Sequence, residues 1–176
     1  MDAGEGLLEV LDELPPTRVL CDVATTLYDA PRLFGPQKGA TPEQVAELEA
    51  RFRANDRLRP YADLPGSGAA GGLGAALASL GAELVPGAAT VLDLLGFDPT
   101  SYELVVTGEG RVDATTGEGK VPFEVARRCR AAGVRCVLFG GIVDVDSLLD
   151  AEVVALSGDP ARAAQDLEEL GARLLG

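Results

Sequence analysis

The chain has 176 residues, of which 47% are hydrophobic and 5% aromatic, with 22 glycines and no histidine. Its formal net charge of −13 argues against nucleic acid or an anionic membrane as a partner, because both need a basic surface. Histidine is the commonest general base and zinc ligand, so any acid–base chemistry falls to carboxylates or lysine.

The apolar residues argue against a membrane protein, and the cysteines argue against a disulfide or a metal site. No apolar run is long enough to span a membrane, and the acidic N-terminus lacks the basic region of a signal peptide, so we expect a cytoplasmic protein. Cys21, Cys129 and Cys136 are odd in number and lie inside strand or helix patterns. Buried free thiols are therefore expected rather than a disulfide or a metal site.

The first predicted elements are a short helix over residues 5–14, which Pro15-Pro16 end, and a strand over residues 17–22. Asp22 comes at the end of this strand. A carboxylate in that position either binds a metal ion or a hydroxyl group, or simply forms a turn. Both interpretations stay open here.

A turn and a helix follow. The segment Leu33-Phe-Gly-Pro-Gln-Lys-Gly-Ala40 predicts a turn from which Gln37 and Lys38 present hydrogen-bond donors suited to an anion; a solvated turn is the alternative. The next helix has Thr41 as its N-cap and a buried face formed by Val45, Leu48 and Phe52.

A glycine-rich segment, residues 65–74, contains a formal Gly-x-Gly-x-x-Gly. No predicted strand precedes it, so a dinucleotide site lacks its structural context. The spacing of Leu73, Leu77 and Leu80 predicts a helix instead. Exposed N–H groups at its start would bind an anion, and close helix packing explains the glycines equally well.

The remaining elements alternate between helices and strands. Residues 83–87 are interpreted as a connection, and Gly108, Gly110 and Gly140-Gly141 as turns. The predicted elements are a helix over 88–95, a strand over 104–106, a helix over 122–132, a strand over 135–139, a short helix near 147–149, a strand over 152–156 and a last helix starting at Asp159-Pro160. This alternation predicts parallel strands with right-handed crossovers.

The loop after the strand at residues 104–106 concentrates reactive groups. It offers carboxylates, cations and hydroxyls beside glycines, namely Glu109, Asp113, Arg111, Lys120, Thr115 and Thr116. Such a set suits a phosphate, or a carboxylate with a metal ion. The alternative is a solvated loop whose charges pair with one another. The spacing fits neither a Walker A loop nor the dinucleotide fingerprint.

At these residues a family resemblance becomes specific. Thr107-Gly-Glu-Gly-Arg-Val-Asp113, followed by Thr116, Gly119-Lys120 and Pro122, closely resembles the signature loop of the bacterial glycerate kinase family, the type 1 glycerate 2-kinases. Two earlier segments resemble further motifs of the same family in the same order, Phe34-Gly-Pro-Gln-Lys-Gly39 and Pro65-Gly-Ser-Gly-Ala-Ala-Gly-Gly72.

The resemblance implies an α/β fold, with a Rossmann-like parallel sheet that has helices on both faces, plus part of a second, smaller α/β lobe. Residues 1–95 would resemble the later part of the family's inserted domain, and residues 96–176 the C-terminal half of its Rossmann-like domain. Members phosphorylate glycerate with ATP and Mg²⁺, giving 2-phosphoglycerate in this branch. We therefore expect glycerate or a similar small hydroxy acid as substrate.

Roles for individual residues follow from the same resemblance. Catalysis is expected from Glu109, Arg111, Asp113 and Lys120. Binding of substrate or phosphate is expected from Lys38, Gln37, Gly66, Gly68, Gly71, Gly72 and Thr116. Metal binding is expected from Asp22 and Asp113.

The chain resembles only the C-terminal part of the family, whose members are longer at the N-terminus. It is either a fragment, or an enzyme whose missing N-terminal half comes from a partner chain, or a truncated, catalytically inactive ligand-binding or subunit-interaction module. Differences from the family at Thr25-Thr26, Thr115 and Gly117-Glu118 favour the inactive module. A severed half-domain would leave apolar faces exposed, which favours a partner chain or a homo-oligomer.

Overall fold

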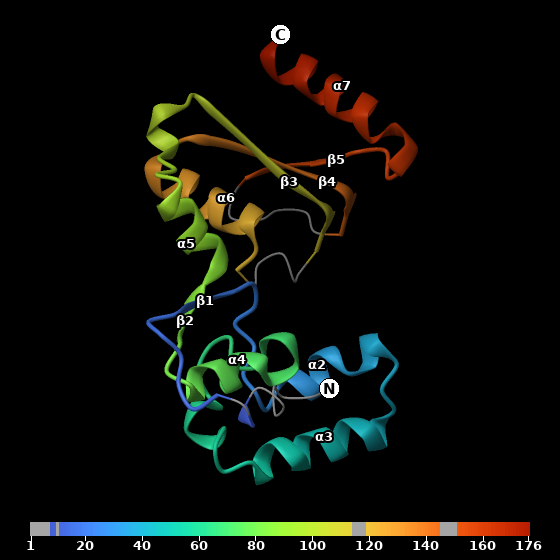
Figure 1. Cartoon of the computed structure of the whole chain (residues 1–176). Coiled ribbons are helices and arrows are strands. Elements are labelled where there is room, and N and C mark those ends of the chain that lie inside the picture. The colour runs from blue at the N-terminus through green and yellow to red at the C-terminus, as the bar shows by residue number, and fades with distance from the viewer. Residues whose placement is uncertain (1–7, 10, 114–118, 145–150) are drawn as a thin grey trace. The chain divides into compact units, whose positions relative to one another are not determined.

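The computed structural model describes residues 8–9, 11–113, 119–144 and 151–176. The chain divides into two units, Met1–Val91 and Leu92–Gly176, each with its own parallel sheet (Figure 1). The boundary falls close to the expected division after residue 95, and which kinase domain each unit corresponds to stays a prediction. Within the described residues, no helix is both long and apolar enough to cross a membrane.

The first unit pairs two short strands and surrounds them with helices. Strand β1 runs parallel to β2, with Arg18 opposite Glu83, and their side chains form an ion pair of 3.6 Å. The elements are β1 (Arg18–Cys21), α2 (Ala30–Phe34), α3 (Pro42–Ala54), α4 (Ala69–Ser79), β2 (Glu83–Pro86) and the start of α5 (Gly87–Leu94), with short 3-10 helices at Pro36–Lys38 and Arg59–Tyr61.

Two sequence predictions in this unit are wrong. Residues 83–87 are not a connection, because β2 occupies Glu83–Pro86; a four-residue strand that ends in proline has too little alternation to be recognised without its partner. Residues 11–14 are not helical, and the N–H of Leu14 instead donates to the carbonyl of Leu80 at 2.8 Å. The strand predicted over 17–22 is confirmed as β1.

Helix α3 begins as predicted. Thr41 accepts a hydrogen bond from the N–H of Gln44, and the Gln44 side chain accepts one from the N–H of Thr41 at 2.9 Å, which completes a capping box. Phe52 of this helix is buried in the core of the unit with Leu27, Leu58, Ala62, Ala75 and Ala76.

The second unit is a three-stranded parallel sheet in the order β3-β4-β5. Figure 1 shows helices α6 and α7 on opposite faces of this sheet. The elements are β3 (Leu104–Val112), α6 (Val121–Ala132), β4 (Arg135–Val143), β5 (Glu152–Ala155) and α7 (Ala163–Leu175), with short 3-10 helices at Pro99–Ser101 and Pro160–Arg162. Parallel pairing places the carboxyl ends of all three strands at one edge.

The turns predicted at Gly108, Gly110 and Gly140-Gly141 are wrong, because β3 and β4 run straight through these glycines. Packing explains Gly108, since a Cβ there would lie 2.6 Å from the ring of Phe139. The short helix predicted near residues 147–149 lies outside the described residues. The α/β class with parallel strands is confirmed.

The face of the sheet covered by α6 holds the core of this unit. Leu92, Val125, Ala126, Cys129 and Cys136 form its buried cluster, with Val105 packed against it. All three cysteines are free and buried, as predicted. Burial raises the pKa of the Cys136 thiol to about 12, with a smaller contribution from neighbouring Cys129.

Candidate functional site

The carboxyl edge of the second sheet carries most of the predicted catalytic residues. Val105 packs against the α6 core, and side chains two residues apart share a face of a strand. Glu109 and Arg111 therefore lie on the α6 face of β3, close to the edge where α6 begins.

Glu109 and Lys120 are brought together as an ion pair. Lys120 is the N-cap residue of α6, and its Nζ lies 3.3 Å from Oε2 of Glu109. The Glu109 side chain is 20% exposed and that of Lys120 is 39% exposed, so a small ligand can reach both. The pair places a carboxylate and an ammonium group at the start of a helix whose N-terminus favours anions.

Arg111 forms an ion pair with Asp144, the residue that follows β4. The N–H of Asp144 donates to the carbonyl of Val112 at 2.8 Å, which fixes Asp144 beside the end of β3. Both side chains of the pair are about half exposed. Asp144 was missed in the sequence, because the strand was predicted to end at residue 139, whereas β4 continues to Val143 and places Asp144 directly after it.

Asp113 directly follows β3 and is partly buried at the same edge. It is therefore close in sequence to Glu109 and Arg111 and belongs to the same end of the sheet. Thr116, expected to bind substrate or phosphate, lies outside the described residues.

A buried charge network holds the first turn of α6. The Glu124 carboxylate accepts hydrogen bonds from Arg127 at 2.7 Å and from Arg128 at 2.8 Å, and Arg128 also reaches Asp93 at 2.7 Å. Arg127, more than Arg128, holds the pKa of the Glu124 carboxyl below its usual range. The network fixes the end of α6 that presents Lys120.

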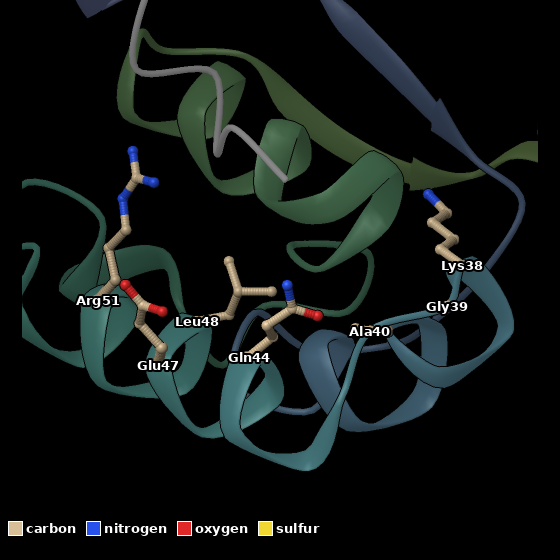
Figure 2. A pocket seen from close by; sticks show the side chains of 8 residues that line it. Lys38, Gly39, Ala40, Gln44, Glu47, Leu48 and Arg51 are labelled. Atoms are coloured by element: carbon tan, nitrogen blue, oxygen red, sulfur yellow. The ribbon is translucent and has the colours of Figure 1, made fainter.

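The first unit has a separate pocket of about 480 Å³, lined by the start of α3 and by the preceding 3-10 turn. Figure 2 shows Lys38 and Arg51 at opposite ends of this pocket, with Gln44 and Leu48 between them. Gln37 is exposed on the same 3-10 turn and is not among the lining residues. Gln44 and Arg51 were missed as lining residues, because the sequence predicted only the cap and the buried face of this helix.

The glycines of residues 65–74 are buried, and the N–H groups of several of them have partners within the unit. The N–H of Gly68 donates to Thr25, and those of Gly71 and Gly72 donate to the carbonyl of Gly68. Gly66 packs against Cys21, since a Cβ on Gly66 would lie 2.6 Å from its Sγ. These contacts fit close packing, the alternative interpretation of this segment, and any binding of phosphate here stays a prediction.

Asp22 is exposed directly after β1, at the carboxyl end of the first sheet. Among the residues that the structure describes, no group of three or more His, Cys, Asp or Glu side chains could hold a metal ion. Metal binding by Asp22 and Asp113 therefore stays a prediction.

The chain is similar to proteins of one family along most of its length. The model of the glycerate kinase family matches residues 5–172. The glycerate 2-kinase of Escherichia coli K12 is 44% identical over 62% of this chain and 32% of its own length. A glycerate kinase of Halalkalibacterium halodurans is 39% identical over 70% of this chain and 36% of its own length.

A crystal structure from Salmonella typhimurium LT2 that carries the name glycerate kinase 2 also matches. It is 38% identical with a TM-score of 0.55, over 80% of this chain and 40% of the other. The chain thus spans about a third of the length of the curated relatives just named.

Proposed function

This chain belongs to the glycerate kinase family, and we propose that it carries part of a kinase site that transfers a phosphoryl group from ATP to glycerate, giving 2-phosphoglycerate. The observation that carries the proposal is the meeting of Glu109, Lys120 and Arg111 with the start of α6 at one sheet edge. Ligands of open α/β sheets bind at such edges.

Arg111 is proposed to bind the carboxylate of glycerate. A guanidinium group has five N–H donors in a planar fork, and Asp144 leaves part of that fork to other acceptors. Because the Arg111 side chain is about half exposed, an incoming carboxylate can share or replace Asp144. This contact would orient the hydroxyl group of glycerate for attack.

Lys120 is proposed to neutralise phosphate charge, together with the N-terminus of α6. In the reaction, the glycerate hydroxyl attacks the terminal phosphorus of ATP, and the bond from phosphorus to the ADP oxygen breaks as the new bond forms. The hydroxyl proton passes to the carboxylate of Glu109 or Asp113. Positioning and electrostatic stabilisation supply most of the rate in such transfers.

Mg²⁺ is proposed as the metal, bound through Asp113 or Asp22 together with phosphate oxygens. The donor set fits, because Mg²⁺ bound with a nucleotide needs only one or two carboxylates and keeps several waters. When bound, the ion neutralises charge on the phosphates. In the first unit, Lys38 is proposed to bind an anionic group of a substrate, because it lines a pocket of about 480 Å³ together with Arg51.

The second candidate function is a truncated, catalytically inactive module that binds ligands or a partner subunit. One observation favours it: the N–H groups of Gly68, Gly71 and Gly72 already donate to carbonyl groups of the same unit. A partner chain that supplies the remaining part of the site, or a homo-oligomer, is compatible with either function.

The test compares Arg111→Ala with Arg135→Ala. Arg135 forms a similar exposed ion pair, with Glu152 at 2.9 Å, at the opposite end of the same sheet. Calorimetric titration with D-glycerate in the presence of ATP and Mg²⁺ should show binding that Arg111→Ala abolishes and Arg135→Ala leaves unchanged. A coupled assay of ADP release on the same samples measures turnover.

Three outcomes separate the two functions. Turnover that depends on Arg111 supports the kinase. Binding without turnover, lost only in Arg111→Ala, supports a kinase site that needs a partner chain. If the wild-type chain binds neither D-glycerate nor nucleotide, or if Arg111→Ala and Arg135→Ala behave alike, the kinase proposal is wrong.

A further inference from the structure

Three glycines lie next to one another near the carboxyl ends of the second sheet: Gly110 in β3, Gly141 in β4 and Gly158 in the turn after β5. A Cβ on Gly141 would lie 2.9 Å from the carbonyl oxygen of Gly110, and one on Gly158 would lie 3.3 Å from that of Gly141. The three peptide backbones therefore approach one another without side chains between them, and Gly158 also has a φ of +76°.

These glycines line a pocket of about 380 Å³ whose other walls are mainly apolar. Its apolar lining comes from Phe139, Ile142, Leu156, Pro160, Ala163 and Leu167. Ile142 and Leu167 are about 41% and 43% exposed, so their side chains are within reach of a ligand. Small-molecule pockets measure roughly 300–1,000 Å³, so this one suits a single ring system with a small substituent.

The charged residues that line the pocket are all acidic, and two of them pair with cations outside the lining, Glu109 with Lys120 at 3.3 Å and Asp166 with Arg162 at 3.8 Å. Glu109, Asp159 and Asp166 line it, and its lining residues, all in the described part of the chain, include no lysine or arginine. The Asp166 carboxylate already accepts bonds from the N–H and hydroxyl of Ser157 at 3.1 and 2.5 Å. Phosphate is therefore disfavoured inside the pocket, whereas a neutral group that donates hydrogen bonds is favoured.

Asp159 is positioned to accept hydrogen bonds from a ligand in the pocket. Its Oδ1 accepts the N–H of Ala161 at 2.9 Å, which fixes the side chain at the pocket. A carboxylate has two oxygens and about four acceptor positions, so Asp159 retains acceptor capacity for hydroxyl or amino donors. Carboxylates after a strand end bind ribose hydroxyls in other open α/β sheets.

We propose that this pocket binds the base and ribose of a purine nucleotide. The flat ring packs on the bare peptides of the three glycines and against Phe139 and Ile142, while Asp159 accepts hydrogen bonds from ribose hydroxyls. Glu109 is among the residues that line the pocket, and its side chain pairs with Lys120 on the α6 face of the sheet, so the phosphates would pass over the carboxyl edge of the sheet toward Lys120 and α6. This inference rests on the proposed function, because it identifies the nucleoside part of the kinase's phosphoryl donor.

The chain's single isoleucine provides a local test, because Ile142 is in the pocket wall. Labelling the isoleucine δ1-methyl group with ¹³C gives one resonance, which an adjacent purine ring shifts. Titration of the full chain with adenosine and with ADP should move this resonance to saturation, with dissociation constants that agree with calorimetry. Tripolyphosphate, which has no base, should leave it in place.

Two variants test whether adenosine occupies the pocket beside Gly110. A Cβ on Gly110 or on Gly171 meets no atom within 4 Å, but only Gly110 lines the pocket. Gly110→Leu should raise the dissociation constant of adenosine about tenfold or more, which is about 1.4 kcal/mol or more. Gly171→Leu, on helix α7, should leave it unchanged.

The outcomes separate this inference from the proposed function. If ADP binds by calorimetry while the Ile142 resonance does not move, the nucleotide binds elsewhere, so the inference is wrong and the kinase proposal stands. If tripolyphosphate alone moves the resonance, the pocket is an anion site and the inference is also wrong. If neither adenosine nor ADP binds, the inference fails together with the nucleotide part of the proposed function. The wild-type titration decides between these outcomes even if Gly110→Leu does not fold.

Discussion

Glu124 is a buried carboxylate in the first turn of α6, and replacing it with glutamine should destabilise the second unit by about 2 kcal/mol. Its two oxygens accept three bonds, two from Arg127 at 2.7 Å each and one from Arg128 at 2.8 Å. Glutamine keeps the shape and the helix propensity but removes the charge.

The magnitude follows from the exposure of the two arginines. The Arg127 side chain is 53% exposed, so water screens its two bonds and replaces part of them when the charge is lost. Arg128 is 17% exposed and stays in place beside the neutral amide. Exchanging a charge-assisted bond of roughly 1.5–3 kcal/mol for a neutral or absent one gives the expected value of about 2 kcal/mol.

The pH dependence gives a second readout with a defined sign. Because the folded-state pKa of Glu124 is lowered, its contribution is present above the unfolded carboxyl pKa of about 4.3 and is lost as pH falls through the lower folded value. The difference in unfolding free energy between the wild type and Glu124→Gln should therefore shrink in acid.

Urea unfolding followed by the Ile142 methyl resonance reports on the second unit, which contains β4. The matched control is Glu152→Gln, which removes the same charge from an exposed pair with Arg135 and should cost about 0.5 kcal/mol or less. Equal losses in Glu124→Gln and Glu152→Gln would refute the argument that burial determines the strength of these pairs.

Three further predictions concern the caps, glycines and thiols. Thr41→Ala should destabilise the first unit by about 1 kcal/mol by removing the α3 cap, measured as the urea concentration at which Cys21 becomes open to thiol labelling. Gly66→Ala should expose Cys21 at lower urea than Gly39→Ala does, because both glycines have positive φ but only Gly66 is packed against another side chain; equal effects would show that packing contributes nothing. Since burial raises the pKa of Cys136 to about 12, the unfolding free energy of the wild type relative to Cys136→Val should fall as pH rises from 9 to 12, measured by urea unfolding across that range.

Local signals in the sequence were enough to predict the ends of several elements. The capping box at Thr41, the cap at Asp159 and the burial of the three cysteines are all confirmed. Each of the two caps depends on residues within a few positions of one another, and hydrogen bonds of this range form in the same way in any fold. The parallel α/β class is confirmed for the same reason, since it follows from the alternation of short elements.

Features that depend on distant partners were not predictable. Strand β2 exists because β1 pairs with it, and Gly108 is extended because Phe139 of the neighbouring strand packs on it. Asp144 lies 33 residues from Arg111 in the sequence, and only the register of β3 and β4 brings them together. A glycine alone indicates either a turn or a close approach, and only the neighbouring strand decides between them.

The charge distribution explains how a chain with a net charge of −13 could bind anionic ligands. Arg135 pairs with Glu152 at the end of the second sheet opposite to Arg111, so its charge is neutralised away from the candidate site. Lys38 pairs with no carboxylate in the described part of the chain, and it lines a pocket with Arg51. Lys120 and Arg111 keep exposed donors at a sheet edge. Repulsion by the acidic surface weakens with distance in salt, whereas these cations act at contact, so local position rather than net charge decides where a phosphate or carboxylate binds.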